Sequence, residues 1–258
     1  MYIVNIFDPK EWDIWFACGS AYRTYPKPVK TAKQFCIEQK ADLCFNLALF
    51  NFSGHETVNY VRTRDFGEVG YGGTSETVEI AWTDKCSGYA VAIKDNSAKL
   101  PNKTWLGGYS KRNGIGMTAS GKIIIAQSTN NVSESAFAAA VLKEVRKRGE
   151  VVKLFLFEDG GGSVQEFSRI SRINSIGTRA VATVTCLKRK SLPKVTRTLT
   201  KGSRGEDVRL LQTILGGVEC DGIFGNGTRS QLRIAQKNLC LVADGSCGPL
   251  TQKALGLR

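Results

Sequence analysis

Two loops with the same residue pattern divide the last part of this chain into short segments. The loops begin at Asp221 and Asp244, and both read Asp-Gly-x-x-Gly-x-x-Thr. Asp-Gly pairs favour tight turns, and each threonine stands near the start of the next segment. Apolar residues recur at helical spacing around these loops, which predicts helices over 206–215, 228–239 and 250–255. Such an internal repeat indicates a small domain of three helices.

The preceding residues follow a strand-forming pattern instead. Stretches rich in β-branched and aromatic residues are bounded by Gly, Asn, Asp and Ser. They predict strands over 77–82, 89–93, 122–126, 151–157 and 179–186. Helices are expected over 31–40 and after Ser133, a capping residue whose helix ends near Gly149. The sequence therefore predicts an α+β N-terminal domain, with a mixed sheet and flanking helices, followed by the small three-helix domain.

A basic segment separates the two patterns. Residues 188–197 hold one proline and five basic residues without any apolar period, which is typical of an exposed linker. We therefore expect the N-terminal domain over 1–188, a basic linker over 189–198 and the C-terminal domain over 199–258.

The net charge of the chain is strongly positive. Its 258 residues include 36 Lys and Arg against 23 Asp and Glu, a balance of +13. Residues 199–258 hold 8 basic and 5 acidic residues, or +3, so the remaining +10 lies on residues 1–198. This excess predicts attraction to a polyanion such as a nucleic acid, an acidic membrane or an anionic wall polymer. A nucleic acid is disfavoured, because the basic residues are dispersed and no recognition motif is present.

The N-terminal residues and the cysteines exclude several classes of protein. The first residues lack the basic segment and the long apolar run of a signal peptide, and no window is apolar enough to span a bilayer. We expect no stable membrane insertion. The eight cysteines include no Cys-x-x-Cys pair, and His55 is the only histidine, so we expect no metal site and no required cofactor, although a divalent cation stays open. Buried reduced thiols are expected, and Cys240 and Cys247 are close enough in sequence to bridge under oxidation.

The C-terminal residues resemble the peptidoglycan-binding domain of bacterial and phage cell-wall hydrolases. The resemblance rests on Gly202–Val208, Leu211–Gln212, Asp221–Gly225, Gln236 and Gly248–Pro249, in order and spacing. It departs at Ala235, where the family often has Phe. The family implies a shallow groove for wall glycan or stem peptide, and we expect Asp221, Phe224 and Gln236 to line it. The alternative is that Asp221–Gly225 only builds a turn and the core.

The strongest candidate for a chemical site follows the predicted strand over 151–157. Two carboxylates, Glu158 and Asp159, precede three glycines and Ser163. Glycines allow close approach of the backbone to a ligand, and their amides can hold an anion or a sugar hydroxyl. The Lys and Ser/Thr of a P-loop do not follow. The motif predicts a sugar or phosphate site with Asp159 at its edge, or else a tight turn alone.

This motif resembles the phosphodiester glycosidase family, in which Asp-Gly-Gly-Gly-Ser follows an apolar strand. A family segment of the form Arg-x-x-x-Gly is present at Arg112–Gly116, and the family's Asn-Gly-Gly-x-Phe becomes Asn46–Phe50, without either glycine. The resemblance spans about residues 28–188. It implies substrate-binding roles for these residues: Asn46, Arg112, Gly160, Gly161, Gly162 and Ser163.

Cleavage of a glycosidic bond needs one carboxyl group as acid and a second group as base or nucleophile. Neighbours on a regular strand point to opposite faces, so only one of Glu158 and Asp159 is expected in the pocket. We assign catalysis to Asp159 and a supporting role to Glu158. The second group is expected from the polar stretch around His55 and Glu56.

Together these features predict a glycoside hydrolase that acts on bacterial peptidoglycan, such as a phage endolysin, with anionic wall polymers as a further partner. Such a protein stays in the host cytoplasm until release and then acts outside it, at the wall. The alternative is a non-catalytic wall-binding or saccharide-binding protein, such as a virion structural protein. The feature that favours this alternative is the loss of the family's two glycines after Asn46, where this chain has Leu47 and Ala48.

Overall fold

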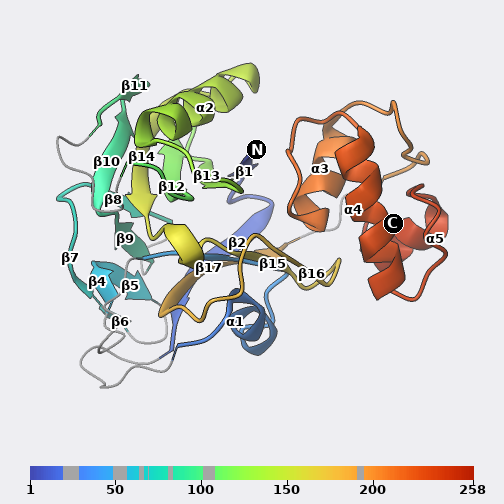
Figure 1. The fold of residues 1–258 in the computed structure, drawn as a ribbon, viewed down its shortest axis with the longest axis horizontal. Helices are drawn as coiled ribbons and strands as arrows, with labels where there is room; N and C mark the ends of the chain where they lie inside the picture. The colour runs from blue at the N-terminus through green and yellow to red at the C-terminus, as the bar shows by residue number, and fades with distance from the viewer. Residues whose placement is uncertain are drawn as a thin grey trace.

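The computed structural model describes residues 1–19, 29–48, 57–63, 67–68, 70–80, 84–100, 108–190 and 195–258. Strands dominate its N-terminal part, and the last three helices lie beside them (Figure 1). This arrangement is the α+β N-terminal part and small helical C-terminal part that the sequence predicts.

Two antiparallel sheets form the centre of the N-terminal part. The six-stranded sheet has the order β1-β13-β12-β14-β10-β11, and the five-stranded sheet has the order β16-β15-β3-β17-β2. The strands of the first sheet are β1 (Tyr2–Phe7), β10 (Ala90–Lys94), β11 (Ser97–Ala98), β12 (Asn113–Thr118), β13 (Ile123–Ser128) and β14 (Val152–Glu158). Those of the second are β2 (Trp12–Cys18), β3 (Leu43–Asn46), β15 (Glu166–Ser168), β16 (Ile173–Ser175) and β17 (Thr183–Arg189).

Shorter strands extend the N-terminal part on one side. A four-stranded sheet has the order β6-β5-β9-β8, and β4 pairs with β7 in parallel. Their bounds are β4 (Thr57–Asn59), β5 (Val61–Thr63), β6 (Gly67–Glu68), β7 (Gly70–Gly72), β8 (Thr77–Glu79) and β9 (Lys85–Ser87).

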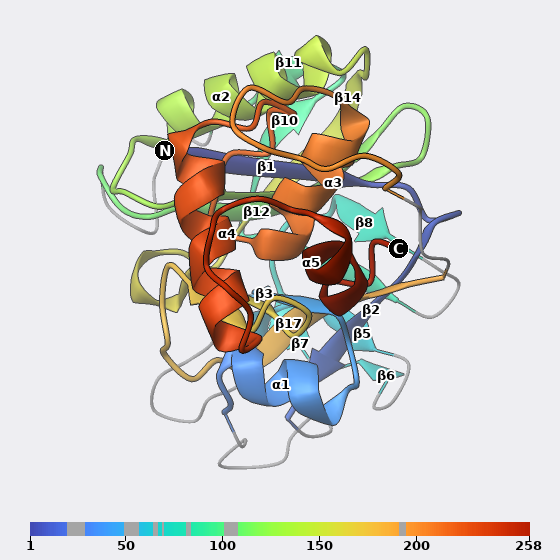
Figure 2. The same ribbon diagram turned by 90° about the vertical axis from the view of Figure 1, so that its right-hand side faces the viewer.

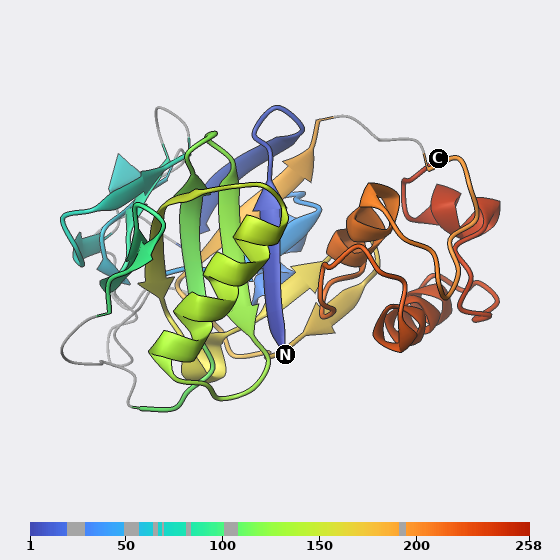
Figure 3. The same ribbon diagram turned by 90° about the horizontal axis from the view of Figure 1, so that it is seen from above.

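The two large sheets pack face to face, and a helix covers each outer face. Helix α2 (Glu134–Lys147) lies on the six-stranded sheet, and α1 (Ala32–Glu38) lies on the five-stranded sheet (Figures 2 and 3). Both helices begin where the sequence predicts, because Thr31 and Ser133 each accept a hydrogen bond from a backbone amide of the first turn. The result is a four-layer arrangement of helix, sheet, sheet and helix.

Strand β14 illustrates how the alternation of side chains builds these layers. Leu154 and Leu156 join the apolar cluster between the sheets, whereas Phe155 and Phe157 join the cluster beneath α2. Side chains of a strand alternate between its two faces, so Glu158 follows Leu156 toward the space between the sheets. The two carboxylates therefore lie at the end of β14, with Glu158 as its last residue and Asp159 directly after it.

The C-terminal helices are α3 (Glu206–Leu215), α4 (Asn226–Asn238) and α5 (Pro249–Ala254), as the repeat predicts within one or two residues. The two repeated loops are each held by a buried glutamine. The Gln212 amide donates to Asp221 at 2.8 Å and to Thr228 at 3.1 Å, and the Gln236 amide donates to Asp244 at 2.8 Å. The threonines of the repeat therefore accept hydrogen bonds in the core rather than cap the helices, whose N-caps are glycines.

We expect Gln236→Met to destabilise the protein by about 2–4 kcal/mol, because buried polar partners lose their hydrogen bonds. The Gln236 side chain donates to Asp244, the Ser246 carbonyl and Thr251, and accepts from the Gly245 amide. Urea unfolding followed by circular dichroism measures the loss. The matched control is Gln231→Met, which removes the hydrogen bond from the Gln231 side chain to the Gly216 carbonyl. An equal loss in both variants would contradict this account of the repeat.

The C-terminal helices dock against the edge strand β16 of the five-stranded sheet (Figure 1). The hydroxyls of Ser168 and Ser171 donate to the carbonyls of Ile214 and Leu215 at the end of α3. Ile173 of β16 also joins the apolar cluster of the C-terminal helices. The edge strand is thereby covered, which protects it from pairing with other chains.

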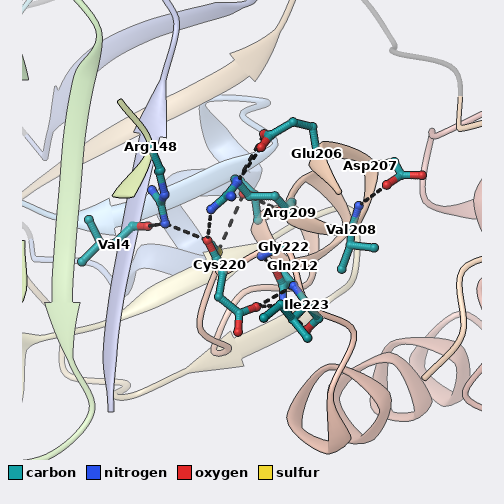
Figure 4. Close-up of polar contacts among 12 residues, drawn as sticks. Val4, Arg148, Glu206, Asp207, Val208, Arg209, Gln212, Cys220, Gly222 and Ile223 are labelled. Carbon is teal, nitrogen blue, oxygen red and sulfur yellow. Dashed lines mark hydrogen bonds and ion pairs between the residues drawn. The ribbon is translucent and has the colours of Figure 1, made fainter. Parts of the chain in front are cut away.

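A second set of contacts joins α2 to the C-terminal helices. The Arg148 guanidinium donates to the carbonyls of Val4 and Cys220, both at 2.7 Å, and Arg209 donates to the same Cys220 carbonyl (Figure 4). Burial lowers the pKa of Arg148. One half-buried guanidinium thus connects a strand of the N-terminal part with a loop of the C-terminal part.

The segment predicted as an exposed linker is packed at both ends. Strand β17 continues through Arg189, whose guanidinium lies 5.1 Å from the centre of the Trp12 ring. Val195 is buried among the C-terminal helices, and its amide donates to the Leu257 carbonyl at 2.7 Å. The expectation of an exposed linker is therefore wrong for these two positions, because burial overrides the basic composition; residues 191–194 lie outside the described residues.

We expect the protein to lose stability as the pH rises from about 4.5 to about 7, because Glu166 is buried where the two parts meet. Burial raises the pKa of Glu166 to about 7, while hydrogen bonds from the Gly217 amide and the Ser175 hydroxyl, both 3.2 Å long, partly oppose the rise. The folded protein therefore keeps this proton up to about pH 7, whereas the unfolded chain releases it near pH 4.5.

Glu166→Gln tests this dependence, because an amide keeps the shape and cannot ionise. The variant is expected to be more stable than the wild type at pH 8, by on the order of 2 kcal/mol, and to be nearly as stable as the wild type at pH 4. Urea midpoints between pH 4 and 8.5 measure the difference, and the exposed Glu219→Gln serves as control. A wild-type profile that does not change over this range would refute the assignment.

Candidate functional site

The candidate site is the turn that follows strand β14. Asp159 and Gly160 lead into a short 3-10 helix, η1 (Gly161–Ser163). The Asp159 amide donates to the Leu47 carbonyl at 3.1 Å, and the Gly161 amide donates to the Lys111 carbonyl at 2.8 Å. The turn is therefore fixed by backbone contacts from both large sheets.

A network of buried amide side chains supports this turn from below. Asn46 donates from its side-chain amide to the Asp159 carbonyl at 2.9 Å and accepts from the Gln165 backbone amide at 3.0 Å. Gln127 donates to the side-chain oxygens of Asn46 and Asn113, at 3.2 and 3.3 Å, and to the Gln165 carbonyl at 3.0 Å. Every one of these side chains is buried. Such a connected network holds a backbone turn in one position.

Asp159 is the titratable group of this turn. Its side chain is only 5% exposed, and burial raises its pKa to about 7; the Ser163 hydroxyl, the charge of Arg179 and the Gly160 amide partly oppose the rise. A carboxyl group with a pKa near the working pH can both hold and release a proton. The Asp159 carboxyl can therefore serve as an acid at neutral pH.

The glycines of the turn make room for an arginine. Gly161 has a φ of +60°, a conformation that favours glycine. A Cβ at Gly162 would lie 2.5 Å from Nη2 of Arg179, so a larger residue there would push the guanidinium away from the turn. Arg179 is exposed and electrostatically coupled to Asp159. Arg179 and Gln165 are not among the site residues that the sequence predicts. Arg179 stands at the start of a predicted strand. Gln165 stands two residues after the glycine motif, and this closeness is the one sequence feature that links it to the site.

Glu158 and Ser163 are both fully buried beside Asp159. The Glu158 charge contributes to the raised pKa of Cys86, after burial itself, which places Glu158 near the cluster between the sheets. The expectation that Glu158 supports the site while Asp159 acts stays a prediction.

Arg112 lies in the interior rather than on a substrate-facing surface. Its guanidinium is within 3.3 Å of the Glu134 carboxylate and donates to the carbonyls of Val132 and Gly108. These contacts are those of a structural arginine, so the geometry does not favour Arg112 as the clamp for an anion. Asn46 likewise uses its amide to hold the turn. A substrate contact for either residue stays a prediction.

The second catalytic group is not described by the structure. His55 and Glu56, the residues expected to supply it, lie outside the described residues.

The three residues expected to line a wall-binding groove differ in their positions. Phe224 and Gln236 are each 1% exposed and belong to the core of the C-terminal helices. Asp221 accepts from Gln212 and from the Ile223 amide and also lines a pocket of about 420 Å³ with Ile223. The contacts of Asp221, Phe224 and Gln236 are therefore those of a turn and a core, as the alternative interpretation expects. Of these three residues, Asp221 also lines a pocket.

The C-terminal helices match a known family. Residues 204–255 match the family model described as "Putative peptidoglycan binding domain". These residues form a peptidoglycan-binding domain. Among curated protein sequences, none matches the chain.

Solved structures that are similar to the chain include the following two. The catalytic domain of zebrafish N-acetylglucosamine-1-phosphodiester alpha-N-acetylglucosaminidase, auto-inhibited by its pro-peptide, is 12% identical with a TM-score of 0.49, over 73% of this chain and 83% of that one. A hypothetical protein from Synechocystis is 9% identical with a TM-score of 0.53, over 72% of this chain and 58% of that one. The Synechocystis likeness shows a related fold over that share of the chain.

Neither the peptidoglycan-binding domain nor the other described residues hold a cluster of three or more His, Cys, Asp or Glu side chains that suits a metal ion. Over the same described residues, no helix combines the length and the apolar character needed to cross a bilayer. The expectations about cofactors and cellular location stay predictions.

Proposed function

We propose that this protein is a cell-wall hydrolase whose N-terminal part cleaves glycosidic bonds of the wall glycan. The observation that carries the proposal is Asp159, a buried carboxyl group with a pKa raised to about 7 on a glycine turn. The same chain has a peptidoglycan-binding domain, which raises the local concentration of the enzyme on its polymer. A phage endolysin that waits in the host cytoplasm and acts at the wall fits this combination.

In the proposed reaction, Asp159 donates its proton to the leaving oxygen of the glycosidic bond. Its raised pKa keeps the proton in place at neutral pH until the bond breaks. The Arg179 guanidinium packs against the glycine turn, where its charge stabilises the Asp159 carboxylate that remains after proton transfer. The group that activates water comes from the His55–Glu56 segment in this proposal.

A second function is a wall-binding protein without catalysis. The related glycosidase motif has two glycines after the asparagine, whereas this chain has Leu47 and Ala48, which are buried in the cluster between the sheets. Larger side chains at these positions leave less room for a sugar above Asn46.

Digestion of purified Gram-positive walls separates the two functions. The hydrolase is expected to release soluble fragments with new reducing ends, detected by mass spectrometry, and Asp159→Asn is expected to release at least about 100-fold less. Release of free amino groups would point to an amidase or peptidase instead. Binding to walls without products from either protein would favour the non-catalytic function.

A further inference from the structure

Three buried cysteines from different elements meet beneath helix α1. Cys36 lies on α1, Cys44 on β3 and Cys186 on β17, and all three are 0% exposed. The Sγ atoms of Cys44 and Cys186 are 3.1 Å apart. All eight cysteines of the chain are free thiols in the structure. Because 142 residues separate Cys44 from Cys186 in the sequence, this contact depends entirely on the pairing of the strands.

The strand register places these two thiols where a disulfide fits. Cys44 lies directly opposite Cys186 in the antiparallel pair of β3 and β17. The Leu47 amide donates to the Thr183 carbonyl, which makes that pair a hydrogen-bonded one. Hydrogen-bonded and non-hydrogen-bonded pairs alternate, so Cys44 and Cys186 form a non-hydrogen-bonded pair, with Cα atoms about 4.5 Å apart. That separation lies within the range of disulfides, and the sulfur atoms need to approach by only about 1 Å.

We propose that Cys44 and Cys186 form a cross-strand disulfide when the protein meets an oxidising environment. The oxidant is a small-molecule disulfide such as oxidised glutathione. One cysteine thiolate attacks it, forms a mixed disulfide and releases one glutathione thiolate. The second cysteine thiolate then displaces the other glutathione. The two cysteines lose two protons and two electrons, and the oxidant becomes two thiols.

Burial makes this reaction slow and its product durable. Burial raises the pKa of the Cys44 thiol, and the neighbouring Cys186 and Cys36 thiols raise it further, so little thiolate is present at neutral pH. Reaction requires a transient opening of α1, which covers both sulfur atoms. The same cover then shields the disulfide from reducing thiols.

Cys36 is the competing partner. Its thiol lies 3.4 Å from the Ala41 carbonyl oxygen and 3.9 Å from that of Phe167, and both contacts hold it beside the strand pair. Cys36 sits on a helix and has no register that fixes it opposite either strand cysteine. The strand pairing therefore favours Cys44 with Cys186.

The disulfide would join the strand that supports the candidate site to its neighbour. Asn46 stands two residues after Cys44 on β3 and holds the Asp159 carbonyl. The disulfide also closes a long loop of the chain, which restricts the unfolded state. This inference depends on the fold alone and holds whether or not the protein is a hydrolase.

The test uses the full chain, purified with reductant and then incubated with oxidised glutathione. The intact mass is expected to fall by about 2 Da, without a glutathione adduct. After alkylation under denaturing conditions, peptide mapping is expected to recover the Cys44 and Cys186 peptides joined, and separate only after reduction. The thermal midpoint is expected to rise by several degrees on oxidation.

Three single variants locate the linkage. Cys44→Ala and Cys186→Ala are expected to lose both the joined peptides and the rise in thermal midpoint, whereas the matched control Cys36→Ala keeps both. Brief incubation in mild urea, which opens α1, is expected to speed the reaction. A linkage through Cys36, or no joined peptides even after the urea step, would overturn the proposal.

Discussion

Arg112→Met is expected to lower the free energy of unfolding by about 3–5 kcal/mol, because it leaves the Glu134 carboxylate buried without its ion-pair partner. The side chains of Arg112 and Glu134 are 1% and 5% exposed. The remaining partner of Glu134 is the Tyr89 hydroxyl at 2.9 Å, and burial together with the Glu134 charge raises the pKa of Tyr89. A hydroxyl cannot replace the charge of a guanidinium.

Urea unfolding at pH 7 measures this loss. Arg146→Met in helix α2 is the matched control, because the exposed Arg146 bonds to Asn96 alone among the described residues, and a change below about 1 kcal/mol is expected there. The double variant Arg112→Met/Glu134→Gln is expected to recover part of the stability, since it removes the stranded charge. A single variant no less stable than the control would show that Arg112 is not the structural arginine described here.

The helices could be predicted closely because their signals are local. Thr31 and Ser133 each bond to a backbone amide three residues away, and Gly149 takes the positive φ of +71° that ends α2. The glutamine contacts of the C-terminal repeat were less visible. Gln212 reaches Thr228 across sixteen residues, so the pattern located both residues without showing that they bond to each other.

The candidate site could be predicted only in part, for the same physical reason. Asp159 and its glycines follow a buried strand, and that sequence order was sufficient to locate the turn. The role of Asn46 depends on β3 lying beneath a turn more than a hundred residues later. The sequence resemblance implies a substrate contact for Arg112, whereas the fold places Arg112 beside Glu134, twenty-two residues later. The roles of Asn46 and Arg112 both depend on contacts between residues far apart in the sequence, which a local sequence pattern does not show.

Asp159→Asn is expected to reduce the release of wall fragments by about 100-fold to 10,000-fold, the usual contribution of a positioned acid. The same variant is expected to be more stable than the wild type at pH 8, by on the order of 2 kcal/mol. The reason is that the folded state raises the pKa of Asp159 from 3.8 to about 7, so ionising this group costs free energy only when the protein is folded. Loss of activity with gain of stability distinguishes a catalytic carboxyl from a structural one.

The pH profile of the wild type reports the role of Asp159 directly. If Asp159 donates a proton, the release of fragments falls as the pH rises through about 7, because the carboxyl loses that proton with its raised pKa. The same samples provide urea midpoints, and stability is expected to fall between about pH 4 and pH 7 and to level off above that. The exposed Asp95→Asn is the matched control, because Asp95 takes a φ of +49° that asparagine tolerates well, and it should change neither activity nor stability. Activity that rises through pH 7 would make Asp159 a base or nucleophile, and activity retained by Asp159→Asn would remove it from the reaction altogether.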